Sequence, residues 1–278
     1  MEHRIARIVV VVILVAIAIV FLVPVYALAL SAFRPGQQLL RYGITPESLL
    51  PTGFTMSSLH TLFTARDGIF LQWFKNSVVL LVLRTSISIM LSAFVGYGLA
   101  TYQFAGRKIL LSAVVFLMVV PIQILILPLF NLMIHFRLMN TVWGVILPFL
   151  VLPFAVFFFR QYAGSLPSEL IDSGRVDGVS EFGIYFRIMM PLMVPAFGAM
   201  IILISLMSWN DFVWPLVVLR SNDMFTIPLG LNSLLTPYQD NYDMLLSGAF
   251  MATLPVFILF FLFQRFFVSG LGEGAVKG

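Results

Sequence analysis

The uncharged stretch IVVVVILVAIAIVFLVPVYALALSA, from Ile8 to Ala32, decides the fold class of this chain. A helix rises 1.5 Å per residue, so about 20 apolar residues are needed to cross the hydrocarbon core of a membrane. His3, Arg4 and Arg7 precede the stretch and Ala27-Leu28-Ala29 resembles a cleavage site, as in a secretory signal. The apolar run exceeds the roughly 7–15 residues of a signal core. We therefore expect a retained transmembrane helix.

Five further segments pass the same length test. Four are uncharged, and the segment from Val78 to Tyr102 is interrupted only by Arg84. We therefore expect an all-α polytopic membrane protein whose residues 1–278 form one transmembrane domain. Its six helices are expected at about 8–32, 76–102, 109–132, 142–160, 188–216 and 244–267.

The composition supports a lipid environment. The 278 residues are 60% hydrophobic and 10% charged, whereas soluble domains have about 45–50% and about 25%. The chain contains no cysteine, which excludes disulfides, thiolate ligands and a cysteine nucleophile. Its three histidines lie far apart without metal-ligand spacing. We therefore expect no metal site, no catalytic residues and no bound cofactor.

The basic residues indicate orientation in the membrane. The net charge of +4 is scattered over short loops, which argues against a nucleic-acid partner and invites the positive-inside rule. With the N-terminus inside, nine Lys and Arg residues fall in cytoplasmic segments and six outside, four of these in the loop 33–75. We expect both termini in the cytoplasm and residues 33–75 to form an extracytoplasmic loop or small cap with little periodicity.

Prolines are frequent inside the expected spans. Proline removes a backbone donor and kinks a helix, although membrane helices tolerate it better than soluble ones. Their density favours bent helices around a pathway, because the freed backbone groups need protein or water partners. The nine prolines are Pro24, Pro121, Pro128, Pro148, Pro153, Pro191, Pro195, Pro215 and Pro255.

The cytoplasmic loop 161–187 is organised in an unusual way for a connector. Its segment LPSELIDSGRVDGVSEF, from Leu166 to Phe182, predicts a helix, a sharp turn and a second helix. Glu169 and Asp172 suit the N-terminal turn of the first helix. Asp177-Gly178 is a turn signal with a positive φ expected at Gly178. Ser180 is expected to cap a second helix through Arg187, which Pro191 separates from the next span.

The same loop carries apolar side chains that would be costly in water: Leu170, Ile171, Val176, Val179, Phe182 and Ile184. One interpretation is packing against helix ends of the same chain. The other is docking of a cytoplasmic partner.

Several strings together resemble one family. The segment from Pro167 and Glu169 through Asp177-Gly178 to Pro191 resembles the EAA loop of permease subunits in binding-protein-dependent ABC importers, closest to the maltose-type carbohydrate branch. The resemblance covers nearly the whole chain, and the order of the strings makes it specific. The other strings are Asn76-Ser77, Tyr97–Ala100, Phe104–Arg107, Leu138–Gly144, Trp209–Asp211, Gln264–Gly270 and Gly274–Gly278.

The resemblance implies function and partners. It implies a subunit in the inner membrane of a prokaryote that takes up a sugar or sugar-like solute by ATP-driven alternating access. Its implied partners are a second homologous permease, two ATP-binding cassette subunits and an extracytoplasmic solute-binding protein. ATP and Mg²⁺ would bind to the partner ATPases, in agreement with the lack of a GxxxxGK[ST] loop here.

The resemblance also implies that the loop couples the permease to its ATPases. The residues matched to that role are Glu169, Asp172, Gly174, Arg175, Asp177, Gly178 and Phe182. Where the family usually has Glu-Ala-Ala, this chain has Asp172-Ser173-Gly174. Glycine costs a helix about 1 kcal/mol relative to alanine, so we expect a shorter or more mobile first coupling helix.

Polar residues within the spans are candidates for a substrate pathway. Trp209, Asn210 and Asp211 end an apolar span, and intramembrane carboxylates usually face an interior or a cavity. The alternative is a position at the outer interface. Arg84 either contacts the partner permease or the cavity, or reaches water from the outer leaflet.

Other functions fit less well. Within the transporter class, the solute could be a glycerophosphodiester or a polyol. A self-sufficient secondary transporter would need its own coupling charges, and only Arg84 and Asp211 lie within or at the edge of the spans. A membrane enzyme would need a nucleophile and base at recognisable spacing, which the sequence lacks.

Overall fold

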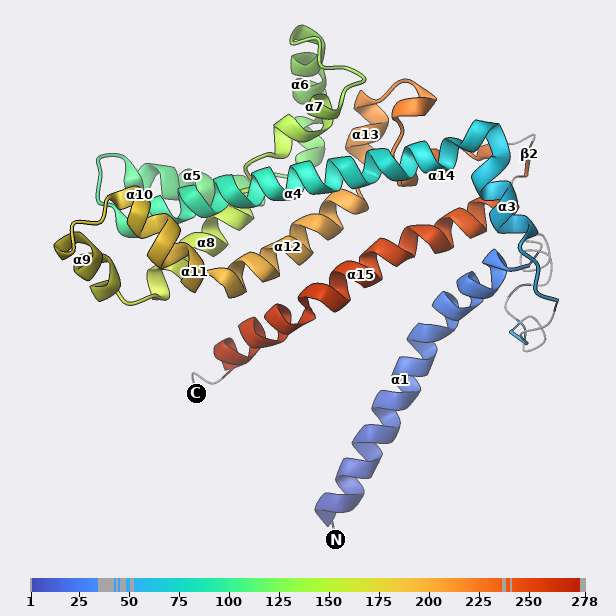
Figure 1. The fold of residues 1–278 in the computed structure, drawn as a ribbon, viewed down its shortest axis with the longest axis horizontal. Coiled ribbons are helices and arrows are strands. Elements are labelled where there is room, and N and C mark those ends of the chain that lie inside the picture. The colour runs from blue at the N-terminus through green and yellow to red at the C-terminus, as the bar shows by residue number, and fades with distance from the viewer. Residues whose placement is uncertain are drawn as a thin grey trace. The chain divides into compact units, whose positions relative to one another are not determined.

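The protein is almost entirely helical, as expected. The computed structural model describes residues 2–34, 43, 45, 49–50, 53–236, 239–240 and 242–275. The long helices are α1 (Glu2–Ala32), α4 (Ile69–Thr101), α12 (Val194–Trp209) and α15 (Tyr242–Ala275), shown in Figure 1. The mid-length helices are α5 (Arg107–Val119), α6 (Ile122–His135) and α8 (Pro153–Ser165).

Shorter elements connect the long ones. They are α3 (Ser57–Thr64), η1 (Ala65–Gly68), α7 (Val142–Ile146), η2 (Leu147–Phe149), α9 (Glu169–Val176), α10 (Glu181–Gly183), the π-helical turn η3 (Ile184–Met189), α11 (Met190–Leu192), α13 (Val213–Val218), η4 (Asn222–Met224), α14 (Ile227–Asn232), and the antiparallel pair β1 (Leu235–Thr236) and β2 (Gln239–Asp240).

Up to six segments of the described chain could cross a membrane by length and composition. Three are helices at Arg4–Ala32, Ser57–Thr101 and Tyr242–Gln264. The other three are bent helix pairs, α5 with α6, α7 and η2 with α8, and the segment Glu181–Leu192 with α12. They overlap the six predicted spans, and the third bent pair, Glu181–Trp209, begins and ends before the predicted bounds of 188 and 216. Helix α4 begins at Ile69, ahead of the boundary predicted at residue 76.

Proline lies at each of the three bends, which confirms the prediction of bent helices there, whereas Pro24, Pro128 and Pro255 lie inside α1, α6 and α15, which continue past them. The α5–α6 pair bends by 104° at Pro121, and the α7–α8 pair bends by 49° just before Pro153. The third pair bends by 75° at Met193, between Pro191 and Pro195. Each of these prolines caps or begins a helix, where its missing N–H costs least.

The third bend corrects the predicted end of the second loop helix. That helix was expected to stop at Arg187, with Pro191 as the break, but it continues through η3 and α11 to Leu192. Pro191 lies in the first turn of α11, a position that tolerates proline, so the break moves to Met193.

Contacts divide the chain into two units, and the first comprises residues 1–74 and 227–255. Its buried residues include Leu62, Phe70, Trp73, Ile227 and Met244. A Cβ on Gly230 would lie 2.2 Å from the Trp73 ring, so only glycine fits there. The loop 33–75, predicted to have little periodicity, contains α3, η1 and the start of α4 in its described part.

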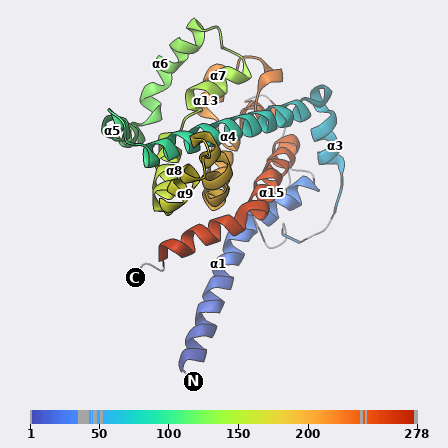
Figure 2. The ribbon, with the colours of Figure 1, turned by 60° about the vertical axis from the view of Figure 1, so that its left-hand side comes forward.

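The second unit comprises residues 75–226 and 256–278, and it carries the loop of interest. Its buried cluster joins α4, α8, α12 and the turn η3. A Cβ on Gly96 of α4 would lie 2.8 Å from backbone atoms of Val156 and Arg160, so α4 and α8 pack closely, as small residues allow between membrane helices. Both views show α9–α11 beside α8 and the C-terminal end of α4 (Figures 1 and 2).

Candidate coupling loop and membrane ion pair

The turn between α9 and α10 has the predicted geometry. Gly178 has φ +75°, in the left-handed region that favours glycine. Its N–H donates to the carbonyl of Arg175, and the Val179 N–H donates to that of Gly174. These two bonds satisfy the last carbonyls of α9 in a Schellman arrangement. The Ser180 hydroxyl then accepts from the Gly183 N–H at 3.2 Å and caps α10, as predicted.

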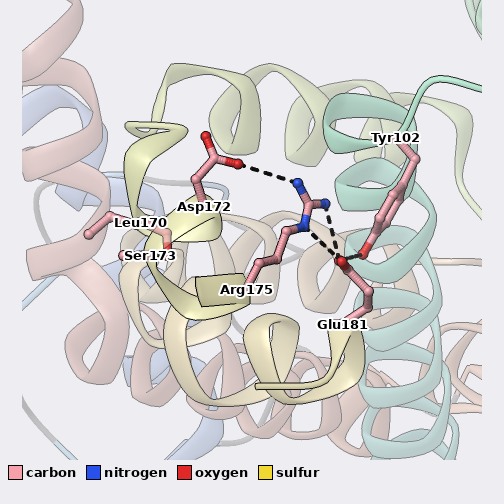
Figure 3. Close-up of polar contacts among 6 residues, drawn as sticks. All are labelled: Tyr102, Leu170, Asp172, Ser173, Arg175 and Glu181. Carbon is pink, nitrogen blue, oxygen red and sulfur yellow. Dashed lines mark hydrogen bonds and ion pairs between the residues drawn. The ribbon is translucent and has the colours of Figure 1, made fainter. Parts of the chain in front are cut away.

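A polar network that the sequence did not predict holds this turn. The Arg175 guanidinium donates to both carboxylate oxygens of Glu181, with Nε–Oε1 at 2.8 Å and Nη2–Oε2 at 3.3 Å. The Tyr102 hydroxyl donates to Glu181 Oε2 at 2.7 Å. Arg175 also reaches Asp172 at 3.4 Å. Figure 3 shows these side chains pointing toward one another from three elements.

The network shifts the pKa values of its members. The hydrogen bonds from Arg175 and then from Tyr102 favour the carboxylate, so they lower the pKa of Glu181. Partial burial, and then the hydrogen bond to Glu181, raises the pKa of Tyr102. The hydrogen bond to Glu181 also raises the pKa of Arg175. Glu181 is therefore ionised and paired at neutral pH.

The apolar side chains of the loop divide into two groups, and the interpretation of packing against the chain's own helices holds for one of them. Ile171 and Ile184 are buried against the chain's own helices. Val176 is 87% exposed and Phe182 is 66% exposed. Beside them lies an open hollow of about 650 Å³, lined by Gly178, Val179, Ser180, Phe182, Gly183, Phe186 and Arg187.

Packing explains why residue 174 is glycine, which helix propensity could not show. Gly174 is buried, and a Cβ there would lie 2.9 Å from Ile188 Cδ1 and 3.1 Å from Ile184 Cγ1. The absent side chain lets α9 approach the η3 turn closely. The cost in helix propensity is thereby offset by closer packing.

Arg84 and Asp211 form an ion pair inside the second unit. Arg84 Nη1 lies 2.7 Å from Asp211 Oδ2, and the two side chains are 6% and 18% exposed. The guanidinium also lies 5.0 Å from the centre of the Phe149 ring, within cation–π range. The sequence gives no sign that these two charges, 127 positions apart, form a pair.

The ion pair lines a pocket of about 330 Å³. The pocket is otherwise apolar and aromatic, with Ile122, Ile126, Phe149, Leu152, Met207, Val213 and Trp214 around it. Of the other two predicted pathway residues, Trp209 is buried and Asn210 is exposed, with its side-chain amide bonded to the Leu206 carbonyl. The structure thus brings together two of the four predicted pathway residues.

Two asparagines hold one connecting segment, and the sequence analysis gave them no role. Asn140 accepts from the backbone N–H groups of Arg220 and Ser221. Asn76 donates to the carbonyls of Asp223 and Phe225. The available signal was that both stand in strings that carried the family resemblance. No group of three metal-ligating side chains lies together in the part of the chain that the structure describes.

The sequence of the chain is similar to those of known membrane transport proteins. Residues 88–272 match the family described as "Binding-protein-dependent transport system inner membrane component". The chain is 51% identical over 262 residues to the arabinooligosaccharides transport system permease protein AraQ of Bacillus subtilis (strain 168), covering 94% of this chain and 92% of that one. It is 36% identical over 204 residues to the lactose transport system permease protein LacG of Rhizobium radiobacter, covering 73% and 74%.

A solved structure shares the fold. It is a crystal structure of a bacterial ABC transporter involved in the import of the acidic polysaccharide alginate, with a TM-score of 0.81 at 21% identity, over 96% of this chain and 98% of that one. The family match over residues 88–272 and the 51% identity to a permease along nearly the full length of both chains lead to one conclusion. This chain belongs to the family of inner membrane components of binding-protein-dependent transport systems.

Proposed function

We propose that this chain is the permease subunit of an ABC importer that takes up an oligosaccharide or a related sugar by ATP-driven alternating access. The observation that carries the sugar class is the 51% identity to an arabinooligosaccharide permease over 94% of this chain. The lactose permease at 36% identity supports the same class.

The proposed assembly contains a second homologous permease, two ATPase subunits and an extracytoplasmic solute-binding protein. Supporting this, the chain has no GxxxxGK[ST] loop with which to bind ATP itself, so ATP and Mg²⁺ would bind to the partner subunits. Six crossings would put both termini on one side, and the basic residues favour the cytoplasm. The membrane is proposed to be the inner membrane of a prokaryote.

The loop 161–187 is proposed to dock on the ATPases. Supporting this, Val176 and Phe182 are largely exposed next to the hollow at Gly178. Apolar groups left in water on a short helix pair are the anchors that a partner groove receives. Glu169, Asp172, Asp177 and Arg175 would form the polar rim around these anchors.

The pocket at Arg84 and Asp211 is proposed to contact the solute on its path. A sugar offers C–H faces to aromatic rings and hydroxyls to charged groups, and both kinds of group line this pocket. Asn210 and Trp209, at the same end of α12, would border the path.

The test is reconstitution into liposomes. The complex with ATPases and binding protein is expected to take up a radiolabelled arabino-oligosaccharide when ATP is supplied inside. The chain alone is expected to show neither ATP hydrolysis nor uptake. A glycerophosphodiester and a polyol serve as competing solutes. Uptake by the chain alone, driven by a proton or sodium gradient, would overturn the proposal in favour of a secondary transporter.

A further inference from the structure

We propose that Glu181 is a positioning residue that fastens the coupling loop to the C-terminal end of α4 through Tyr102 and Arg175. The inference rests on the proposed role of the loop in docking the ATPases. It adds the part of the chain that holds the loop in its docking orientation.

One carboxylate ties three elements together. Glu181 is the first residue of α10, Arg175 lies in the last turn of α9, and Tyr102 directly follows α4. The bidentate contact from Arg175 fixes the angle between α9 and α10, because a guanidinium that bonds both carboxylate oxygens is held in one orientation relative to that carboxylate. The bond from Tyr102 attaches this pair of helices to α4, 79 positions away in the sequence.

A second attachment lies further back along α4. The Phe94 ring stacks on that of Phe182, with centroids 6.2 Å apart and planes at 8°. It also meets the Tyr185 ring edge-on at 5.3 Å. Phe94 and Tyr102 are eight positions apart, about 12 Å along a helix. These two contacts add to the burial of Ile171 and Ile184, and because they lie at separated points they resist pivoting of the loop.

Helix α4 also carries Arg84, 18 positions before Tyr102, about 27 Å along the helix axis. A displacement of the loop is therefore transmitted along a continuous helix to the ion pair at the pocket. Loss of the polar attachment should let the loop pivot about the contacts that remain, without removing the apolar surface that docks. The expected defect is in coupling and not in assembly.

The test compares Tyr102→Phe and Glu181→Gln in the reconstituted complex. The matched control is Ser165→Ala, because that hydroxyl donates to the Tyr162 carbonyl of its own helix. Both variants are expected to keep wild-type ATPase stoichiometry and basal ATP hydrolysis. Solute transported per ATP should fall about two- to five-fold, the range of an exposed charge-assisted contact. Glu181→Gln should be milder than Glu181→Ala, since the amide oxygen can still accept from Tyr102.

A distance measurement reports the orientation of the loop itself. Because the chain has no cysteine, spin labels at Gln103→Cys and Ser173→Cys, two exposed positions, can be placed in the complex with cysteine-free ATPases. Tyr102→Phe should broaden the label-to-label distance distribution, whereas Ser165→Ala should not. Unchanged distances together with unchanged transport per ATP in both variants would overturn the proposal.

A cysteine at position 176 distinguishes failure of the positioning role from failure of the proposed docking. A reagent that cross-links Val176→Cys to an ATPase subunit tests docking directly. Absence of the cross-link in the wild-type background would refute docking by the loop. A cross-link with no effect of Tyr102→Phe or Glu181→Gln would refute the positioning role alone.

Discussion

Arg84 Nη1 lies 2.7 Å from Asp211 Oδ2, which joins two helical segments 127 positions apart in the sequence. Both side chains are largely removed from solvent, and the Phe149 ring lies against the guanidinium. Each charge therefore lowers the free-energy cost of burying the other. Neither is an isolated polar group.

Asp211→Ala is expected to destabilise the chain because it leaves the Arg84 charge buried without its partner. Removing one member of a buried pair costs about 3–5 kcal/mol. The measurement is the midpoint of unfolding in detergent, with Asp223→Ala as the control because Asp223 is exposed on η4. Equal midpoints for the two variants would contradict the structural role of the pair.

The double variant Arg84→Met with Asp211→Leu should recover most of the lost stability, since apolar residues of similar volume often replace a buried pair without loss. It separates stability from transport. Recovered stability without recovered uptake supports a pathway role for the pair. Recovery of both would show that the pair is needed for stability alone.

Gly178→Leu is expected to abolish stimulation of ATP hydrolysis by the loaded binding protein, while membrane insertion and pairing of the permeases are kept. The left-handed backbone costs a side chain with a β-carbon about 1–2 kcal/mol. A Cβ on Gly178 meets nothing within 4 Å, so the leucine would project into the space of the partner. Gly178→Asn is the control, because asparagine tolerates this conformation. Wild-type stimulation in Gly178→Leu would rule out the loop as the coupling element.

Gly96→Ala is expected to weaken packing between α4 and α8. Its Cβ would lie 2.8 Å from backbone atoms, which cannot rotate away, and overpacking of this kind costs about 1–3 kcal/mol. Gly98→Ala, two positions along the same helix, is the control, since its Cβ would meet nothing within 4 Å. Thermal unfolding of both variants in detergent tests this. Equal loss, or no loss, in the two would contradict the close packing.

The attachment of the loop should be lost in acid. Because Arg175 and Tyr102 lower the pKa of Glu181, the contact is complete above the ordinary pKa of a glutamate. It is lost as pH falls through the lowered pKa of the folded state. The spin-label distances between Gln103→Cys and Ser173→Cys should be constant near neutral pH and broaden in acid. Glu181→Gln should remove that transition, and a transition that persists in Glu181→Gln would assign it to another group.

Much of the coupling loop was predictable because its signals are local. Gly178 has the positive φ that the Asp-Gly turn predicts, and Ser180 caps the helix that follows it. Burial was only half predictable. Ile171 and Ile184 are buried, whereas Val176 and Phe182 are exposed. All four side chains are apolar, so residue type alone does not tell the two groups apart. Helix propensity counts against glycine at position 174. The structural reason for glycine there is the close approach of Ile184 and Ile188 from another element, which no local pattern shows.

The sequence by itself determined the membrane class, the segments long and apolar enough to cross, and proline as the marker of three helix bends. Apolar length and proline are properties of a short segment, and lipid leaves a backbone few alternatives to the helix. Only the tertiary structure decided which polar groups meet, as Arg84 meets Asp211 and Tyr102 meets Glu181. These pairs lie 127 and 79 positions apart, so they depend on how α4 packs on the later helices. That packing is set by close approaches such as Gly96 on α8, which no local pattern records.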